Sequence, residues 1–173
     1  VFTTSDCLSE EKREGTLGLL FLTDLKGYDI VLGKFFARGL NAFYGLIAIF
    51  PVLAIPLLLG GVTGGEFWRV SFALVNALFF SLSLGILVSA LSRDDRKAMG
   101  NTFFLLLFVN VVIPLASLIG ARAGVAEISA ILGWLSPVKT FFAAYEANCS
   151  TPALDYWIGL LFTQFLGWTF LIL

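Results

Sequence analysis

Long stretches without a charged residue are the feature that most limits what this chain can fold into. Three of them, with 27, 23 and 24 residues, separate charged positions, and a fourth of 18 residues follows Asp155. A helix of about 20 apolar residues crosses the ~30 Å hydrocarbon core of a bilayer. The pattern therefore predicts an all-α, polytopic helical membrane protein with four transmembrane helices. We place these helices at about 38–60, 67–91, 98–120 and 156–173.

The composition agrees with this interpretation and excludes several classes of protein. Hydrophobic residues make up 58% of the chain and charged residues 13%, which leaves too few charges to cover a water-soluble body of this size. The net charge of −1 argues against nucleic acid as a partner. The chain has no His, the residue on which most catalytic triads and many metal sites depend. We therefore predict no catalytic residue, no metal site and no cofactor bound by this chain.

Basic residues set the expected orientation, because they are enriched on the cytoplasmic side of membrane proteins. Eight of them lie before the first span or between the second and third, against three elsewhere. We therefore expect residues 1–37 to form a cytoplasmic segment that leads into the membrane, and residues 38–173 to form a transmembrane domain. The eight are Lys12, Arg13, Lys26, Lys34, Arg38, Arg93, Arg96 and Lys97.

The connection at 121–155 contains two apolar stretches that are too short to cross a membrane. Pro137 separates them. We expect one or two short helices here, which lie in the outer interface or re-enter the membrane.

The ends of the sequence are unusual for a whole membrane protein. It begins at Val1, has Met99 as its only Met, and stops at Leu173 within an apolar run. We therefore expect an internal piece of a longer protein, with the last helix truncated.

The cytoplasmic segment contains an amphipathic stretch at residues 9–25. Ser9 is a good helix N-cap, and two Glu residues follow it in the first turn. Leu17, Leu20 and Phe21 share one helical face. Such a helix either floats on the bilayer surface or docks on a cytoplasmic partner, and periodicity alone favours the first interpretation.

Residues 11–17 (EKREGTL), then Leu19-Leu20, Thr23 and residues 30–34 (IVLGK), resemble the signature of ATP-binding-cassette (ABC) exporter permeases of the type-2 class. The resemblance favours docking over floating. Two departures stand out: Gly18 lies where many members carry Glu, and Asp24 lies where most carry Pro. Asp24 is a mild change, because both residue types suit the first turn of a helix.

The resemblance implies a six-helix permease, of which these four spans are the third to sixth. It implies a separate cytoplasmic ABC ATPase as partner, which holds ATP and Mg²⁺, and a second permease copy or a paralogue in a dimer. It also implies a location in the bacterial inner membrane. The residues that it assigns to coupling with the ATPase are Glu11, Glu14, Gly15, Thr16, Leu17 and Leu20.

The second span carries small residues at every fourth position. Small residues at this spacing let helices approach closely in lipid, so we predict a packing interface there. Uncharged amide side chains also lie within the spans. Such side chains more often bridge two membrane helices than bind substrate, so we expect a packing role for them as well. The stripe consists of Ala73, Ala77, Ser81, Gly85 and Ser89.

The sequence argues against ATP binding by this chain and against ion-coupled transport. Residues 27–35 superficially resemble a P-loop, but five residues separate the glycines and Phe35 replaces the hydroxyl residue that would hold Mg²⁺. No charge lies at mid-membrane, which disfavours an ion-coupled carrier. We therefore predict a non-enzymatic permease subunit of an ATP-driven exporter. The alternative is a multi-span scaffold that recruits a cytoplasmic protein without transport.

Overall fold

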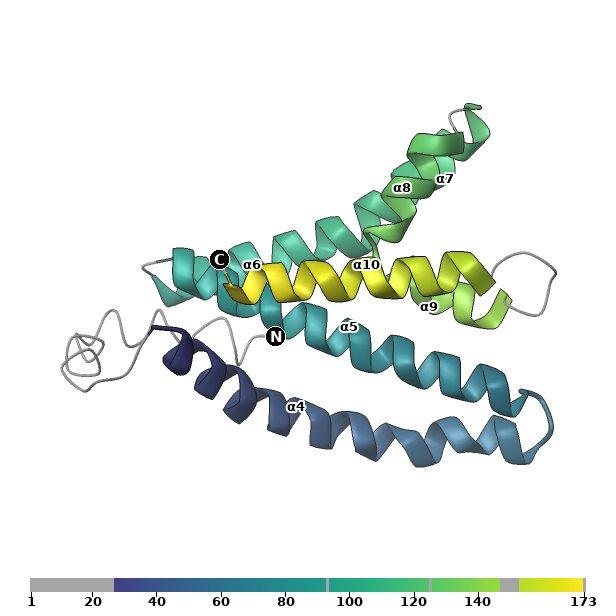
Figure 1. Ribbon diagram of the computed structural model, residues 1–173, viewed down its shortest axis with the longest axis horizontal. Coiled ribbons are helices and arrows are strands. Elements are labelled where there is room, and N and C mark those ends of the chain that lie inside the picture. The colour runs from purple at the N-terminus through teal and green to yellow at the C-terminus, as the bar shows by residue number, and fades with distance from the viewer. Residues whose placement is uncertain (1–26, 93, 125, 147–152, 173) are drawn as a thin grey trace.

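The computed structural model describes residues 27–92, 94–124, 126–146 and 153–172, which form helices and no strand (Figure 1). The predicted all-α class is confirmed. A π-helical turn, Phe108–Val112, joins two of the helices. The helices are α4 (Gly27–Leu58), α5 (Gly64–Leu91), α6 (Asp95–Leu107), α7 (Ile113–Arg122), α8 (Ala126–Trp134), α9 (Pro137–Glu146) and α10 (Ala153–Ile172).

Within the residues that the structure describes, three helical segments are long and apolar enough to cross a membrane, one fewer than predicted. They are Val31–Leu58, Gly64–Leu91 and Arg96–Arg122. The remaining predicted span corresponds to α10, which has 20 described residues. Asp155, Gln164 and several Thr, Tyr and Trp residues lower its mean hydropathy. It nevertheless runs beside α5 along most of its length (Figure 1).

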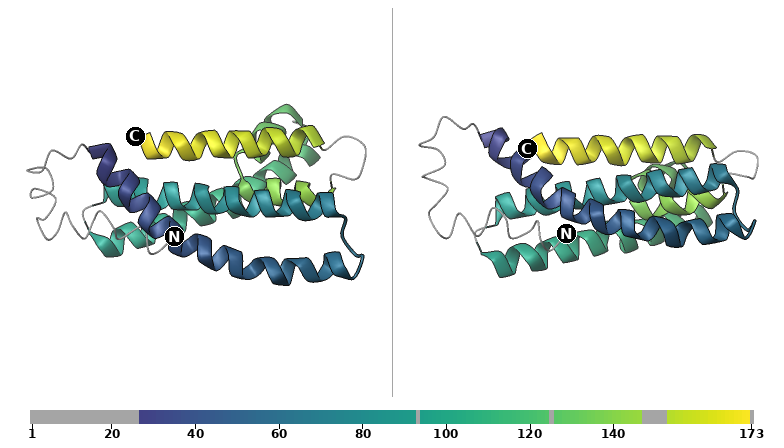
Figure 2. Two further views of the ribbon diagram at one scale, coloured as in Figure 1. Left: turned by 60° about the horizontal axis from the view of Figure 1, so that its bottom comes forward. Right: turned by 90° about the horizontal axis from the view of Figure 1, so that it is seen from below.

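Helix α4 begins at Gly27, ahead of the predicted membrane entry at Arg38. Its 32 residues correspond to about 48 Å, which exceeds the ~30 Å hydrocarbon core. The helix is therefore longer than the core is thick, and Lys34 predicts that its start lies at the cytoplasmic interface. The helix is bent along its length, and it contains Pro51 and Pro56, each of which removes a backbone hydrogen bond (Figure 2).

Helix α5 is the centre of the bundle. Half of its most apolar window is buried, against 6% for α4 and 17% for the segment that begins at Arg96. It packs against α4, α9 and α10. Its start is fixed by a capping box, in which the Thr63 hydroxyl accepts from the Glu66 amide and the Thr63 amide donates to the Glu66 carboxylate. Gly60, with φ of +74°, supplies the left-handed turn just before it.

The predicted span at 98–120 is broken by the π-helical turn and changes direction (Figure 1). Pro114 follows this turn and has no amide hydrogen, so a regular helix cannot continue through it unchanged. The Ile113 amide donates to the Phe108 carbonyl five residues earlier, which is the π-helical pattern. The side chain of Asn110 donates to the Leu106 carbonyl at 2.9 Å. Beyond the bend, α7 points away from the bundle, and α8 returns along α7.

The stretch at 121–155 contains two short helices, α8 and α9. Helix α9 lies against both α5 and α10, so it belongs to the main bundle, whereas α8 packs chiefly on α7. The depth of these helices in the membrane stays a prediction.

The start of α4, the turn between α5 and α6, and the end of α10 lie at the same end of the bundle (Figures 1 and 2). The turn between α4 and α5 lies at the opposite end. This arrangement brings Lys34, Arg96 and Lys97 to one end, which is the end that basic residues predict to be cytoplasmic. The same end receives the chain from the segment at 1–26.

Candidate functional site

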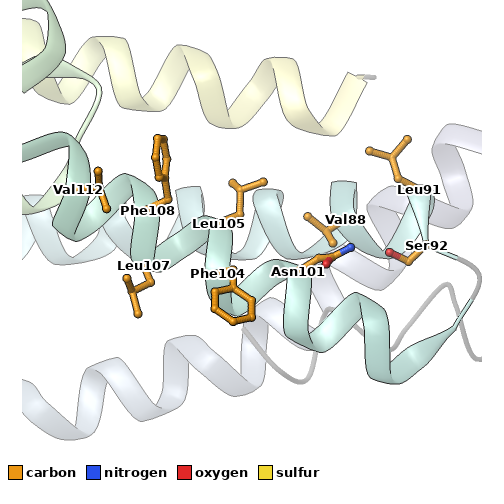
Figure 3. A pocket seen from close by; sticks show the side chains of 9 residues that line it. All are labelled: Val88, Leu91, Ser92, Asn101, Phe104, Leu105, Leu107, Phe108 and Val112. Carbon is orange, nitrogen blue, oxygen red and sulfur yellow. The ribbon is translucent and has the colours of Figure 1, made fainter.

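An open groove of about 760 Å³ follows α6 from the end of α5 (Figure 3). Ser92 and Asn101 form its polar end, close to the turn between the two helices. Its other lining side chains are apolar and continue along α6 into the π-helical turn. They are Val88, Leu91, Phe104, Leu105, Leu107, Phe108 and Val112. The groove therefore has a polar mouth near the predicted cytoplasmic end and an apolar body.

The turn beside this mouth is charged. Lys97 forms an ion pair with Asp94 across 2.7 Å, and both side chains are largely exposed. The hydrogen bond from Lys97, with its positive charge, lowers the pKa of the Asp94 carboxyl below its ordinary value. Arg96 is exposed at the start of α6. The polar end of the groove therefore lies close to a charged turn.

A polar contact inside the bundle joins α5 to α10. Asn76, which is only 5% exposed, donates from its side-chain nitrogen to the Thr163 hydroxyl oxygen at 2.5 Å. The Thr163 hydroxyl donates to the Gly159 carbonyl of its own helix at 2.8 Å, so it can accept from Asn76. The side-chain oxygen of Asn76 is buried without a hydrogen-bond partner. This contact ties two segments that are 87 residues apart in sequence.

A second polar contact ties the same helices nearer the opposite end. The Tyr156 hydroxyl donates to the backbone carbonyl of Arg69 at 2.9 Å, and the Tyr156 side chain is fully buried. Val70, Ala73 and Ala144 pack around the Tyr156 ring. The two contacts together fix both the distance and the register of α10 on α5.

Glycines allow this close approach. A Cβ added at Gly167 would lie 2.6 Å from the Phe79 ring of α5, and one at Gly159 would lie 2.8 Å from the Thr140 hydroxyl of α9. Such separations are far shorter than normal van der Waals contact, so neither position has room for a larger side chain.

The predicted packing stripe on α5 faces more than one neighbour. Ala73 is buried against α9 and α10, Gly85 and Ser89 are buried, and Ala77 and Ser81 are half-buried. A helix has 3.6 residues per turn, so residues four apart are offset by about 40° around its axis. The stripe therefore winds around α5 and meets more than one neighbour. Its predicted role as a single interface stays a prediction.

The predicted coupling residues lie outside the described part of the chain. They are Glu11, Glu14, Gly15, Thr16, Leu17 and Leu20. Within the described ranges, no group of three or more Cys, Asp or Glu side chains could hold a metal ion.

Thr163 and Tyr156 make the contacts between α5 and α10 that the sequence does not single out. The sequence gives little indication of either residue, because hydroxyl side chains are common within the apolar runs of membrane helices. Only the fold shows that Thr163 meets Asn76.

Comparison with known proteins gives a clear family result. A family model described as "ABC-2 family transporter protein" matches residues 1–173, which is the whole sequence. None of the curated proteins to which the chain was compared matches it.

Proposed function

The chain belongs to the ABC-2 family of transporter permeases, and from this premise we propose that it is the membrane subunit of an ATP-driven exporter. Membership makes it an integral membrane component of an ABC transporter, in agreement with its three long apolar helices. The export direction, the coupling to ATP hydrolysis and a bacterial inner-membrane location are the proposed parts. The observation that carries the proposal is the match of the family over the full sequence.

We infer that the segment at 9–25 docks on a separate cytoplasmic ATPase subunit, which binds ATP and Mg²⁺. The segment directly precedes α4, whose start lies at the same end of the bundle as the turn between α5 and α6. In this proposal Glu11, Glu14, Gly15, Thr16, Leu17 and Leu20 contact the ATPase.

Movement of the docked segment would reach the membrane through α4. This helix is continuous from Gly27 to Leu58, so a displacement at its start would pass along it into the membrane. Phe35 of α4 packs on Leu82 and Ile86 of α5, which links α4 to the central helix. In this proposal the substrate path lies between two such bundles, so a second permease copy or a paralogue would complete it.

The test is co-purification of the full-length protein in detergent with candidate ATPase subunits, scored by a stoichiometric band and by ATP hydrolysis. We expect a stable, active complex. The double variant Glu14→Lys with Gly15→Pro should lose the ATPase while its amount in the membrane is unchanged. Asp94→Lys is the matched control, because it makes the same charge change in a predicted cytoplasmic turn outside the docking segment and should keep the ATPase.

Two results would count against the proposal. If the double variant keeps the ATPase as well as the wild type does, the docking role of the segment is wrong. If a well-folded protein binds no ATPase at all, the scaffold interpretation replaces the permease one.

A further inference from the structure

Two polar atoms deep in the bundle have no hydrogen-bond partner among the described residues. One is the side-chain oxygen of Asn76 on α5, and the other is the hydroxyl of Ser136, the residue just before α9. The Asn76 side chain is 5% exposed and the Ser136 side chain is fully buried. A buried polar group without a partner costs stability, so each of these two atoms calls for one.

The two atoms lie at the same level of the bundle. Helices α9 and α10 pack side by side in opposite directions, and Thr140 on α9 lies against Gly159 on α10 (Figure 1). Ser136 comes one turn before Thr140, and its carbonyl accepts from the Thr140 amide. Thr163 comes about one turn after Gly159, so it is level with Ser136. Thr163 is also the residue that accepts the hydrogen bond from Asn76.

Three helices meet at this level, because α9 packs on α5 as well as on α10. Leu135, the residue before Ser136, packs against the apolar cluster that contains Phe80, one turn after Asn76 on α5. Thr163 is ten residues from the start of α10, which corresponds to about 15 Å in a helix of 20 residues. The layer is therefore remote from both ends of the bundle.

The chemistry of the two groups indicates what kind of molecule joins them. The Asn76 side-chain oxygen can only accept hydrogen bonds, so it disfavours an anion. Ser136 directly precedes α9, and the amide groups at the start of a helix carry partial positive charge, which disfavours a cation. Water is neutral and can both donate and accept. Buried waters commonly satisfy polar groups that the protein leaves unpaired.

We propose that one internal water molecule binds in this layer, donates a hydrogen bond to the Asn76 oxygen and bonds to the Ser136 hydroxyl. The water ties the start of α9 to α5, beside the direct contact of α5 with α10. The site belongs to the folded bundle, so it does not depend on the docking of an ATPase.

A double-mutant cycle tests the bridge. The purified full-length protein is unfolded in mixed detergent micelles as wild type, Asn76→Leu, Ser136→Ala and the double variant. We expect Ser136→Ala to raise the unfolding equilibrium constant about threefold to fivefold, because the water loses a partner. In the Asn76→Leu background the same substitution should raise it by no more than about twofold, because the bridge is already broken.

Two results of the cycle would overturn the proposal. A Ser136 hydroxyl without any partner would give no loss of stability in either background. A hydroxyl that only caps α9 would give the same loss in both. Ser117→Ala is the matched control, because this buried hydroxyl donates to the Pro114 carbonyl on α7, and its effect should not depend on Asn76.

A direct hydrogen bond between Asn76 and Ser136 would also couple the two substitutions, so a second measurement separates it from a bridge. A cryo-electron microscopy map of the wild-type protein in nanodiscs, at a resolution that shows ordered water, serves this purpose even if a variant folds poorly. Density for a water between the two side chains supports the proposal. Direct contact of the side chains, or a resolved layer without such density, contradicts it.

Discussion

The side-chain nitrogen of Asn76 on α5 donates to the hydroxyl oxygen of Thr163 on α10 across 2.5 Å, inside the apolar bundle. Each partner has a different second contact. Thr163 also donates to the Gly159 carbonyl at 2.8 Å, whereas the side-chain nitrogen of Asn76 has only the more distant Leu160 carbonyl at 3.5 Å. The two partners therefore differ in what they lose when the contact is removed. A substitution at Asn76 should change the free energy of unfolding by a different amount from a substitution at Thr163.

We expect Thr163→Val to destabilise the protein more than Asn76→Leu does. The first change leaves a buried amide without its main acceptor, at a cost of about 1–2 kcal/mol. The second removes the whole amide, including the oxygen that has no partner, so its cost should stay below about 1 kcal/mol. Unfolding of the purified protein in mixed detergent micelles measures both. Thr169→Val is the control, because its hydroxyl donates only within α10. The reverse order of the two costs would contradict this account.

Close approach of α10 to α5 at Gly167 makes a second prediction. Gly167→Ala places a methyl group against the Phe79 ring, and the forced shift should cost about 1–3 kcal/mol of unfolding free energy. Gly45→Ala on α4 is the matched change, because no atom lies within 4 Å of its added Cβ. It should be neutral or stabilising by up to about 1 kcal/mol, since Ala is the better helix former. Equal losses of stability at both positions would show that the contact between Gly167 and Phe79 does not limit how closely α10 approaches α5.

The sequence predicts the helical class and the approximate spans well, because the hydrocarbon core demands long uncharged runs and these are visible in one dimension. It predicts the depth and bend of these helices less well. Charges mark where a span ends, but α4 continues as a helix past Arg38 to Gly27. Likewise Pro114 indicates a kink, yet the π-helical turn before it depends on how Asn110 and its neighbours pack.

The contacts of the site are harder still to predict. Asn76 stands out as a polar residue in an apolar run, but its partner is 87 residues away. Any of several hydroxyl residues in the last span could have met it, and only the register of α10 on α5 selects Thr163. That register is set by side-chain volume, at Gly167 and Phe79 among others, which no local pattern encodes.

The ion pair in the turn between α5 and α6 predicts a dependence on pH. Lys97 lowers the pKa of the Asp94 carboxyl in the folded protein, so the pair stabilises the fold above the unfolded-state pKa near 3.8. The contribution is lost as the pH falls through the lower folded-state value. Thermal unfolding of wild type and Asp94→Asn should thus differ by a small, constant amount near neutrality and converge in acid. Because both side chains are exposed, added salt should shrink the difference. A difference that grows in acid would contradict the assigned pair.

The hydroxyl of Tyr156 supplies the last prediction. Tyr156→Phe keeps the buried ring among Val70, Ala73 and Ala144 but removes the donor to the Arg69 carbonyl, so it should cost about 1 kcal/mol of unfolding free energy.

Two controls separate this loss from other effects of the substitution. Tyr44→Phe removes a hydroxyl from a side chain that is 66% exposed and should leave the stability unchanged. Arg69→Lys should keep the stabilising effect of the Tyr156 hydroxyl, because the acceptor is a backbone carbonyl and not the guanidinium. If Tyr156→Phe costs nothing in the Arg69→Lys background while it destabilises the wild type, the hydroxyl acts through the Arg69 side chain. In that case the carbonyl is not what holds the end of α10 to α5.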